Sequence, residues 1–111
     1  MPTDAPYNPR EDPILREFLA RVREAVGREP VETILFGSRA RGDHDPMSDY
    51  DLIMVYDEVT PEMREAIRRT QSDVGFERDA LISAFVYAEP DLARACYEPF
   101  MMNAAREGVA L

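Results

Sequence analysis

Two short polar motifs lie close together in the first half of the chain, and both contain residues that can bind phosphate or metal. Gly37-Ser38 ends an apolar run over residues 34–36, which predicts a strand, a tight turn and then one helical turn. Free backbone N–H groups at the start of a helix can hold a phosphate, and a glycine lets the backbone approach it closely. The sequence therefore predicts a phosphate-binding loop at Gly37-Ser38.

The second motif, Asp49-Tyr50-Asp51, follows a polar loop and opens an apolar run that ends at Tyr56. Side chains alternate across a strand, so Asp49 and Asp51 should point to one side and Tyr50 to the other. Two carboxylates on one face repel each other unless a cation lies between them, and Mg²⁺ prefers such oxygen ligands. A phosphate loop followed by paired carboxylates is suited to phosphoryl or nucleotidyl transfer.

The two motifs in this order resemble the signature of the DNA polymerase beta-type nucleotidyltransferase superfamily. The fuller text, Phe-Gly-Ser-Arg-Ala-Arg-Gly followed by Ser-Asp-Tyr-Asp-Leu, is similar to its small members, the minimal nucleotidyltransferase (MNT) domain proteins. The resemblance implies a nucleotidyltransferase fold, ATP as substrate and two Mg²⁺ ions. It implies catalytic metal ligands at Asp49 and Asp51 and nucleotide contacts from Gly37 and Ser38. Arg39 is close enough along the chain to touch phosphate, or is surface charge.

The family usually supplies a third carboxylate from a later strand, where it helps to bind the second ion and acts as a base. Residues 76–87 predict a third strand, and Asp79 is its best candidate for catalysis and metal binding. Leu81 or Ser83, which share its parity, could occupy the family position instead, and Glu77 has the same parity. If Asp79 is only a surface acid, transfer would be weak or absent and nucleotide binding could survive alone.

The remaining sequence predicts the elements that position these motifs. Helices are expected over residues 13–26, 61–71, 89 to 95 or 97, and 99–107. Strands are expected over residues 32–36, 50–56 and 76–87. Residues 1–11 are expected to form a flexible arm, residues 72–75 to end the second helix, and residues 109–111 to be a tail. The result is a single α/β (α+β) domain over residues 12–111, with a small mixed sheet and helices packed mainly on one face.

Composition narrows the possible functions. The chain has 111 residues and a formal net charge of −9, which argues against direct binding to nucleic acid, since that needs a basic face. No apolar run is long enough to span a membrane, and the N-terminus lacks the pattern of a signal peptide. A single cysteine, Cys96, excludes an internal disulfide and fits the cytoplasm, and we expect it to be inert.

Polar residues of the loop before the paired carboxylates have simpler interpretations. Asp43 and Asp45 are expected to shape a turn, and His44, the only histidine, to be solvated rather than a general base. Ser48 is expected to orient the loop rather than to act as a nucleophile. Tyr50 is expected to serve in packing.

Family resemblance also implies a partner. MNT proteins similar to this one are often antitoxins paired with a HEPN-domain ribonuclease toxin, and they transfer AMP from ATP to a tyrosine of that toxin. The acidic balance of this chain suits docking on a basic partner. Two other functions stay open: an inactive MNT-fold antitoxin that neutralises its partner by contact alone, and a small-molecule nucleotidyltransferase. A homodimer could also complete the small site across its interface.

Overall fold

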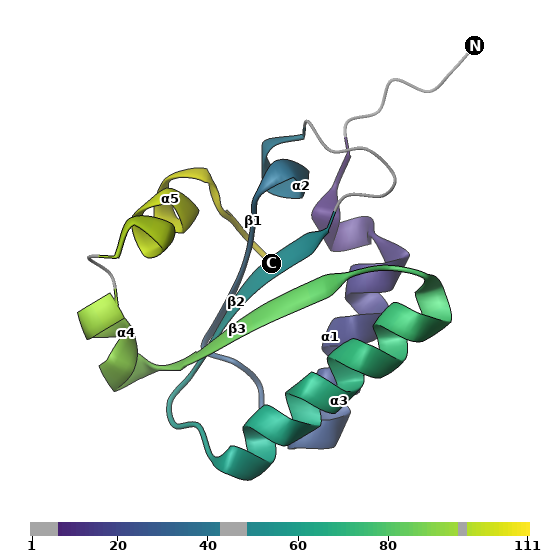
Figure 1. Cartoon of the computed structure of the whole chain (residues 1–111), viewed down its shortest axis with the longest axis horizontal. Helices are drawn as coiled ribbons and strands as arrows, with labels where there is room; N and C mark the ends of the chain where they lie inside the picture. The colour runs from purple at the N-terminus through teal and green to yellow at the C-terminus, as the bar shows by residue number, and fades with distance from the viewer. Residues whose placement is uncertain (1–6, 43–48, 96–97) are drawn as a thin grey trace.

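The computed structural model describes residues 7–42, 49–95 and 98–111. Four strands form one mixed sheet in the order β3-β2-β1-β4 (Figure 1). The strands are β1 (Glu32–Phe36), β2 (Tyr50–Tyr56), β3 (Ile82–Ala88) and β4 (Val109–Ala110). β1 is antiparallel to β2 and to β4, whereas β2 and β3 are parallel. This confirms the α/β fold class, with β2 as a central strand.

The helices surround this sheet. They are η1 (Pro9–Glu11), α1 (Pro13–Val26), α2 (Ser38–Arg41), α3 (Pro61–Arg78), α4 (Glu89–Ala95) and α5 (Pro99–Glu107). α1 begins and ends where the sequence predicts: the Asp12 side chain accepts from two backbone N–H groups of the first turn, and Gly27 ends the helix with a positive φ. No helix among the described residues is long and apolar enough to cross a membrane.

Two apolar layers lie on opposite faces of the sheet. The longer helices α1 and α3 cover one face, where alternate residues of β2 pack against Leu15, Phe18 and other buried side chains (Figure 1). On the other face Ile53 and Val55 pack against residues of α4 and α5. Burying a side chain of this size contributes about 1.5–3 kcal/mol, so the larger layer under α1 and α3 dominates the core.

The third strand and the helix before it differ from the sequence prediction. α3 continues to Arg78 instead of ending near residue 71, and β3 starts only at Ile82. Gly75 was expected to break the helix, but it lies inside it. A Cβ at Gly75 would lie 2.8 Å from the Ala80 carbonyl oxygen, so this glycine permits the tight return of the chain after α3. Burial of Val74 outweighs the roughly 1 kcal/mol that glycine costs in a helix.

Both ends of the described chain contact β1 or its neighbour. The expected tail over residues 109–111 is instead strand β4, and the Leu111 N–H donates to the Thr33 carbonyl at 2.9 Å. Residues 7–11, predicted as part of a flexible arm, contain η1, and Arg10 donates to the Ala110 carbonyl at 2.6 Å. Asp43, His44, Asp45, Ser48 and Cys96 lie outside the described residues.

Candidate active site

The predicted phosphate loop lies directly against one of the predicted metal ligands. Phe36 and Asp51 are opposite each other in the β1–β2 register, so the turn after β1 starts beside the carboxylate. Gly37 has φ 81° and ψ −159°, and a Cβ built on it would lie 2.8 Å from Asp51 Oδ2. In any other residue the Cβ would force the Asp51 carboxylate to turn away. The positive φ and the close approach therefore both favour glycine here.

The single helical turn after Gly37 is α2. Its first hydrogen bonds run from the Ala40 and Arg41 N–H groups to the Gly37 carbonyl, each at 3.1 Å. The N–H groups at the start of a helix have no partner within that helix, and they are the groups that a phosphate would bind. Arg41 forms an ion pair with Glu107 of α5 at 3.1 Å, which ties the far end of this turn to the second helical layer.

The paired carboxylates have an electrostatic need for a cation. Burial raises the pKa of Asp51, and the charge of Asp49 raises it further. Among the described residues, neither carboxylate forms an ion pair. Mg²⁺ is commonly bound by one or two carboxylates together with substrate phosphates and water, so this donor set fits it.

Apolar and weakly polar neighbours explain the desolvation of Asp51. It lies between Phe36 of β1 and Ser83 of β3 in the sheet register. One row further along, Phe85 approaches Phe36 with ring centroids 6.1 Å apart, and Ile53 lies between their strands. A carboxylate in such surroundings loses hydration that only a cation or a hydrogen-bond donor can replace.

The predicted third carboxylate does not lie on the third strand. Asp79 ends α3 in the left-handed region with φ 51° and ψ 51°, a conformation that aspartate tolerates better than most residues, and its side chain is exposed. In the register Ser83 is the β3 residue opposite Asp51. Where the chain is described, no three His, Cys, Asp or Glu side chains are grouped closely enough to hold a metal ion. The strand placement of Asp79 was wrong because α3 extends further than its sequence pattern indicates.

The alternatives for that position are also placed by the structure. Leu81 is exposed, and its carbonyl accepts the Tyr50 N–H at 2.9 Å, which starts the β2–β3 pairing. Glu77 forms an ion pair with Arg21 of α1 at 3.0 Å. Of these alternatives, Ser83 is the residue that the register places opposite Asp51.

A buried polar cluster that the sequence analysis missed lies behind the site, on the opposite face of β2. Asp12 Oδ2 accepts hydrogen bonds from the hydroxyl groups of Tyr50 and Tyr7, each at 2.8 Å. The Arg39 guanidinium lies 3.9 Å from the centre of the Tyr50 ring, and its Nη1 is 3.8 Å from Asp12 Oδ2. Asp12 and Arg39 are each less than 10% exposed. Arg39, predicted to contact nucleotide, thus directs its charge into this cluster.

Burial and hydrogen bonding perturb the tyrosines of this cluster. Burial and the Asp12 carboxylate raise the pKa of Tyr7 to about 12, and the same two causes raise the pKa of Tyr50. Both hydroxyl groups therefore stay protonated and donate to Asp12. The sequence indicated only the helix-capping role of Asp12, which uses one carboxylate oxygen and leaves the other available.

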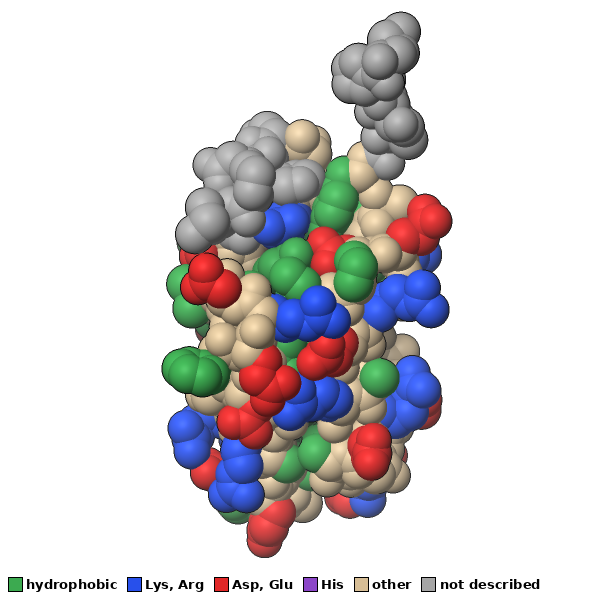
Figure 2. Space-filling model, turned by 90° about the vertical axis from the view of Figure 1, so that its right-hand side faces the viewer, with side chains coloured by type: hydrophobic (Ala, Val, Ile, Leu, Met, Phe, Trp, Pro, Cys, Tyr) green, Lys and Arg blue, Asp and Glu red, His purple; other side chains and the backbone are tan. Residues whose placement is uncertain are grey.

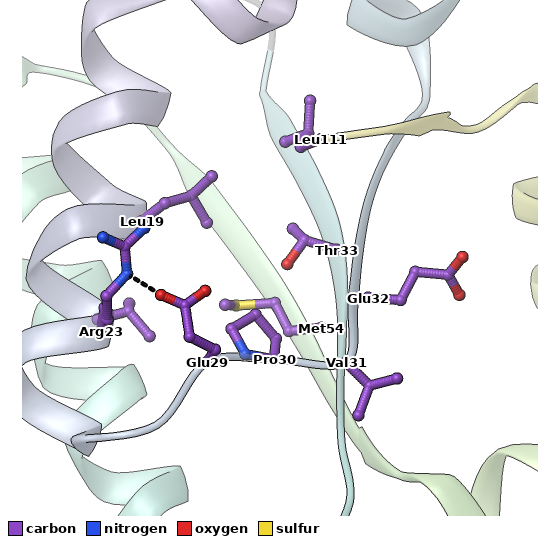
Figure 3. A pocket seen from close by; sticks show the side chains of 10 residues that line it. Leu19, Arg23, Glu29, Pro30, Val31, Glu32, Thr33, Met54 and Leu111 are labelled. Atoms are coloured by element: carbon purple, nitrogen blue, oxygen red, sulfur yellow. Dashed lines mark ion pairs between the residues drawn. The ribbon is translucent and has the colours of Figure 1, made fainter.

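A surface pocket lies away from the predicted site residues. It has a volume of about 220 Å³ and lies between the end of α1, the start of β1 and the end of the chain (Figure 3). Arg23 and Glu29 form an ion pair on its wall at 2.6 Å. Val55 is opposite Glu32 and Asp51 is opposite Phe36, so this pocket adjoins the other end of the β1–β2 pair. It contains none of the predicted site residues.

The face over α1 and α3 shows no concentration of one charge. Figure 2 shows arginine side chains interspersed with aspartate and glutamate on the side that is at the right in Figure 1. Several of these charges are paired, for example Arg78 with Glu17 at 2.6 Å and Arg21 with Glu17 at 3.1 Å. Exposed pairs of this kind contribute little stability individually, about 0–1 kcal/mol.

Comparison with known proteins identifies the family. A model of the family described as "Nucleotidyltransferase domain" matches residues 15–96. A Methanocaldococcus jannaschii protein named "Putative protein adenylyltransferase MJ0141" is 36% identical over 75 residues, which cover 67% of this chain and 76% of that protein. Two solved structures share the fold.

One of these structures is described as "a putative nucleotidyltransferase from Sulfolobus solfataricus", with a TM-score of 0.56 and 22% identity over 87% of this chain and 75% of that one. The other is described as "the toxin-antitoxin with AMP-PNP", with a TM-score of 0.60 and 13% identity over 85% of this chain and 69% of that one. The family match spans the phosphate loop, the paired carboxylates and the strand opposite them. This chain belongs to the nucleotidyltransferase domain family.

Proposed function

We propose that this protein is a Mg²⁺-dependent protein adenylyltransferase that transfers AMP from ATP to a tyrosine of a HEPN ribonuclease toxin and thereby acts as its antitoxin. The observation that supports the transfer chemistry is the close approach of the Gly37 turn to Asp51, a carboxylate whose pKa burial raises. The relative named as a protein adenylyltransferase supports a protein acceptor. The toxin–antitoxin structure supports the partner class at the level of fold.

Each site residue has a role in this proposal. Asp49 and Asp51 would hold Mg²⁺, while the Ser38 hydroxyl and the N–H groups around Gly37 would hold the β- and γ-phosphates. Bound Mg²⁺ neutralises charge on the phosphates and orients them. Arg39 supports the loop from behind, and Asp79 is retained as a proposed third acid that mutation must test.

The proposed transfer is a substitution at phosphorus. The acceptor tyrosine oxygen forms a bond to the α-phosphorus of ATP, and the bond from that phosphorus to the oxygen bridging to the β-phosphorus breaks. Pyrophosphate leaves, and the phenolic proton passes to solvent. Positioning and charge neutralisation supply most of the catalysis in reactions of this class. A domain this small would obtain its acceptor from the partner protein.

The second candidate is an antitoxin that binds its partner without transfer. It is favoured by one observation: Ser83, and not a carboxylate, is the β3 residue opposite Asp51. Without a third acid, binding of a second ion and activation of the acceptor would be weaker. Nucleotide could still bind at Gly37-Ser38.

The decisive experiment is incubation with ATP and Mg²⁺, with and without the candidate partner, followed by intact mass measurement of both proteins. We expect the partner to gain the mass of one AMP group, and Asp49→Asn to abolish that gain. Asp73→Asn is the matched control, because Asp73 is an exposed acid of α3 outside the site. A stable, silenced complex without any adduct would instead establish the binding-only function.

The variant Asp79→Asn tests whether Asp79 is the third acid of the site. Asparagine tolerates the same left-handed backbone, so this variant should fold normally. A large loss of transfer would make Asp79 the third acid. Transfer at the wild-type rate would exclude it from the site.

A further inference from the structure

We propose that Asp12 is a positioning residue for nucleotide transfer, because it fixes the phosphate loop and the catalytic strand relative to each other through Arg39 and Tyr50. The inference rests on the proposed function, since the nucleotide in question is the one bound at Gly37 and Asp51. None of the three residues needs to touch the nucleotide for this effect.

The Asp12 carboxylate links two elements, one through each oxygen. Oδ1 accepts from the Ile14 and Leu15 N–H groups at 2.9 and 3.4 Å, which fixes it to the start of α1. Oδ2 accepts from the Tyr50 hydroxyl at 2.8 Å, which fixes it to β2. Since α1 is packed on the sheet over most of its length, Asp12 is a rigid point of attachment.

Arg39 connects this point to the phosphate loop. It lies in α2, two residues after Gly37, and its guanidinium stacks on the Tyr50 ring at 3.9 Å while facing Asp12. A cation stacked on an aromatic ring is held more strongly when both are desolvated, and weakening the opposite charge beside a buried cation is strongly destabilising. The 7% exposure of Arg39 puts the contact in that desolvated regime.

Asp12 and Arg39 act on the site through Tyr50 and the backbone of β2. Tyr50 is the residue between Asp49 and Asp51, and its ring points to the opposite face from their carboxylates. Gly37 approaches Asp51 so closely that a Cβ added to it would lie 2.8 Å from Oδ2, so a shift of the loop changes the surroundings of this carboxylate directly. A displacement of about 1 Å in such a site can reduce catalysis about 100-fold, so the attachment through Asp12 matters for function.

Asp12→Asn tests the proposal with little change in shape. Asparagine caps helices as well as aspartate does, so α1 keeps its start, whereas Arg39 loses the facing charge. Titration calorimetry with Mg²⁺ and α,β-methylene-ATP, which cannot donate AMP, measures nucleotide affinity without any partner. We expect the Kd of Asp12→Asn to rise at least tenfold at a temperature where the variant is folded.

Tyr7→Phe is the matched control. Tyr7 donates to the same Asp12 oxygen at the same 2.8 Å, and its ring, which phenylalanine keeps, lies 5.9 Å from the Arg39 guanidinium. It belongs to the N-terminal segment and not to β2, so its hydroxyl does not hold the strand of the paired carboxylates. Tyr50→Phe removes the equivalent hydrogen bond on the β2 side and is the second test if Asp12→Asn is too unstable. We expect Tyr50→Phe to raise the nucleotide Kd three- to tenfold and Tyr7→Phe to leave it within twofold, although both lower the Tm.

A transfer assay with the partner then separates positioning from stability. The nucleotide KM of Asp12→Asn should rise by the same factor as its Kd, which a lowered Tm alone would not produce. A wild-type Kd in folded Asp12→Asn or Tyr50→Phe would overturn the proposal, as would an equal loss in Tyr7→Phe. Failure of the wild-type protein to bind nucleotide would instead overturn the proposed function, and this inference with it.

Discussion

Tyr50 and Asp51 are neighbours in β2, yet their side chains lie on opposite faces of the sheet in different environments. Tyr50 points toward α1, where its hydroxyl donates to Asp12 and its ring supports Arg39. Asp51 points to the other face, where it meets Asp49 and the backbone of Gly37 but no positive charge among the described residues. Burial raises the pKa of both groups. Within residues 7–42, 49–95 and 98–111, a hydrogen-bond partner is found for Tyr50 and not for the Asp51 carboxylate.

The difference separates a structural polar cluster from the carboxylate pair that we propose to be catalytic. Buried polar groups whose hydrogen bonds are complete rigidify a fold, whereas an incomplete arrangement stores an unfavourable interaction that a ligand can relieve. The cluster of Asp12, Tyr50 and Arg39 belongs to the first kind. The Asp49–Asp51 pair belongs to the second, and binding of Mg²⁺ with a nucleotide is the relief that we propose.

The largest effect is expected on the rate of transfer, when either carboxylate of the Asp49–Asp51 pair is replaced. Asp49→Asn or Asp51→Asn should reduce metal-dependent transfer at least about 100-fold, on the order of 3 kcal/mol in the barrier. The fold should survive, because these carboxylates repel each other and contribute no ion pair among the described residues. Transfer rates together with a far-ultraviolet circular dichroism spectrum check both parts. Transfer at the wild-type rate in either variant would contradict the site.

The second prediction concerns the contact between loop and carboxylate. Gly37→Ala should weaken binding of Mg²⁺ and ATP at least tenfold, because the new Cβ would lie 2.8 Å from Asp51 Oδ2. The backbone strain at a positive φ should add a loss of stability of about 1–2 kcal/mol. Calorimetric titration and urea denaturation measure the two effects.

Gly27→Ala is the control for that strain. Gly27 has a similar φ of 75°, but nothing lies within 4 Å of its Cβ position. The variant should therefore lose comparable stability and keep its nucleotide affinity. Equal affinities for the two alanine variants would show that the contact with Asp51 is unimportant.

The third prediction concerns how the stability of the metal-free protein changes with pH because of Asp51. Since the pKa of Asp51 is raised in the folded chain, the folded state binds this proton more tightly than the unfolded state does. The resulting destabilisation is absent below the ordinary carboxyl pKa of 3.8 and is complete once the pH has risen through the raised pKa. Metal-free Asp51→Asn should therefore melt at a higher temperature than wild type at pH 7.

Melting curves from pH 3 to pH 8 check this sign. The two proteins should converge as the pH falls below 3.8, and Mg²⁺ with nucleotide should stabilise only the wild type. A Tm difference that stays constant across this pH range would contradict the assignment of the effect to Asp51.

The smallest effects are expected from two tyrosines on the same face of β2. Tyr50→Phe should lose about 1 kcal/mol of stability, because it removes a buried hydrogen bond to Asp12. Tyr56→Phe should be neutral or slightly stabilising, within about 0.5 kcal/mol, because the buried Tyr56 hydroxyl has no hydrogen-bond partner among the described residues. Urea denaturation of both variants gives the comparison. A loss for Tyr50→Phe no larger than that for Tyr56→Phe would mean that the hydrogen bond to Asp12 adds no stability.

Much of this arrangement was predictable because it depends on local chain chemistry. The Asp12-Pro13 and Thr60-Pro61 pairs predict helix starts, and the apolar runs predict β1 and β2, all of which are confirmed. The meeting of the two motifs was also predictable in part, since a turn after one strand and acids at the start of the next come together when those strands pair antiparallel. Antiparallel pairing of β1 with β2 does bring Gly37 to Asp51.

Other features depended on contacts between distant segments. The extension of α3 past Gly75 follows from the burial of Val74 and the return of the chain at Ala80, and local propensity opposes it. That extension moved Asp79 from an expected strand to a helix end and left Ser83 opposite Asp51. The last residues pair with β1 because the edge of that strand offers backbone groups to them, which no pattern in three residues could indicate.

The sequence by itself determined which residues can do chemistry here, because residue type, glycine placement and the alternation of a strand are local properties. It also determined the family to which they belong. Only the tertiary structure decided what those residues contact: that Arg39 turns toward Asp12, that Tyr50 joins them, and that Asp51 is left beside Asp49. The physical reason is that burial and pairing of charges depend on which distant segments fold together, and a linear pattern of residues does not contain that information.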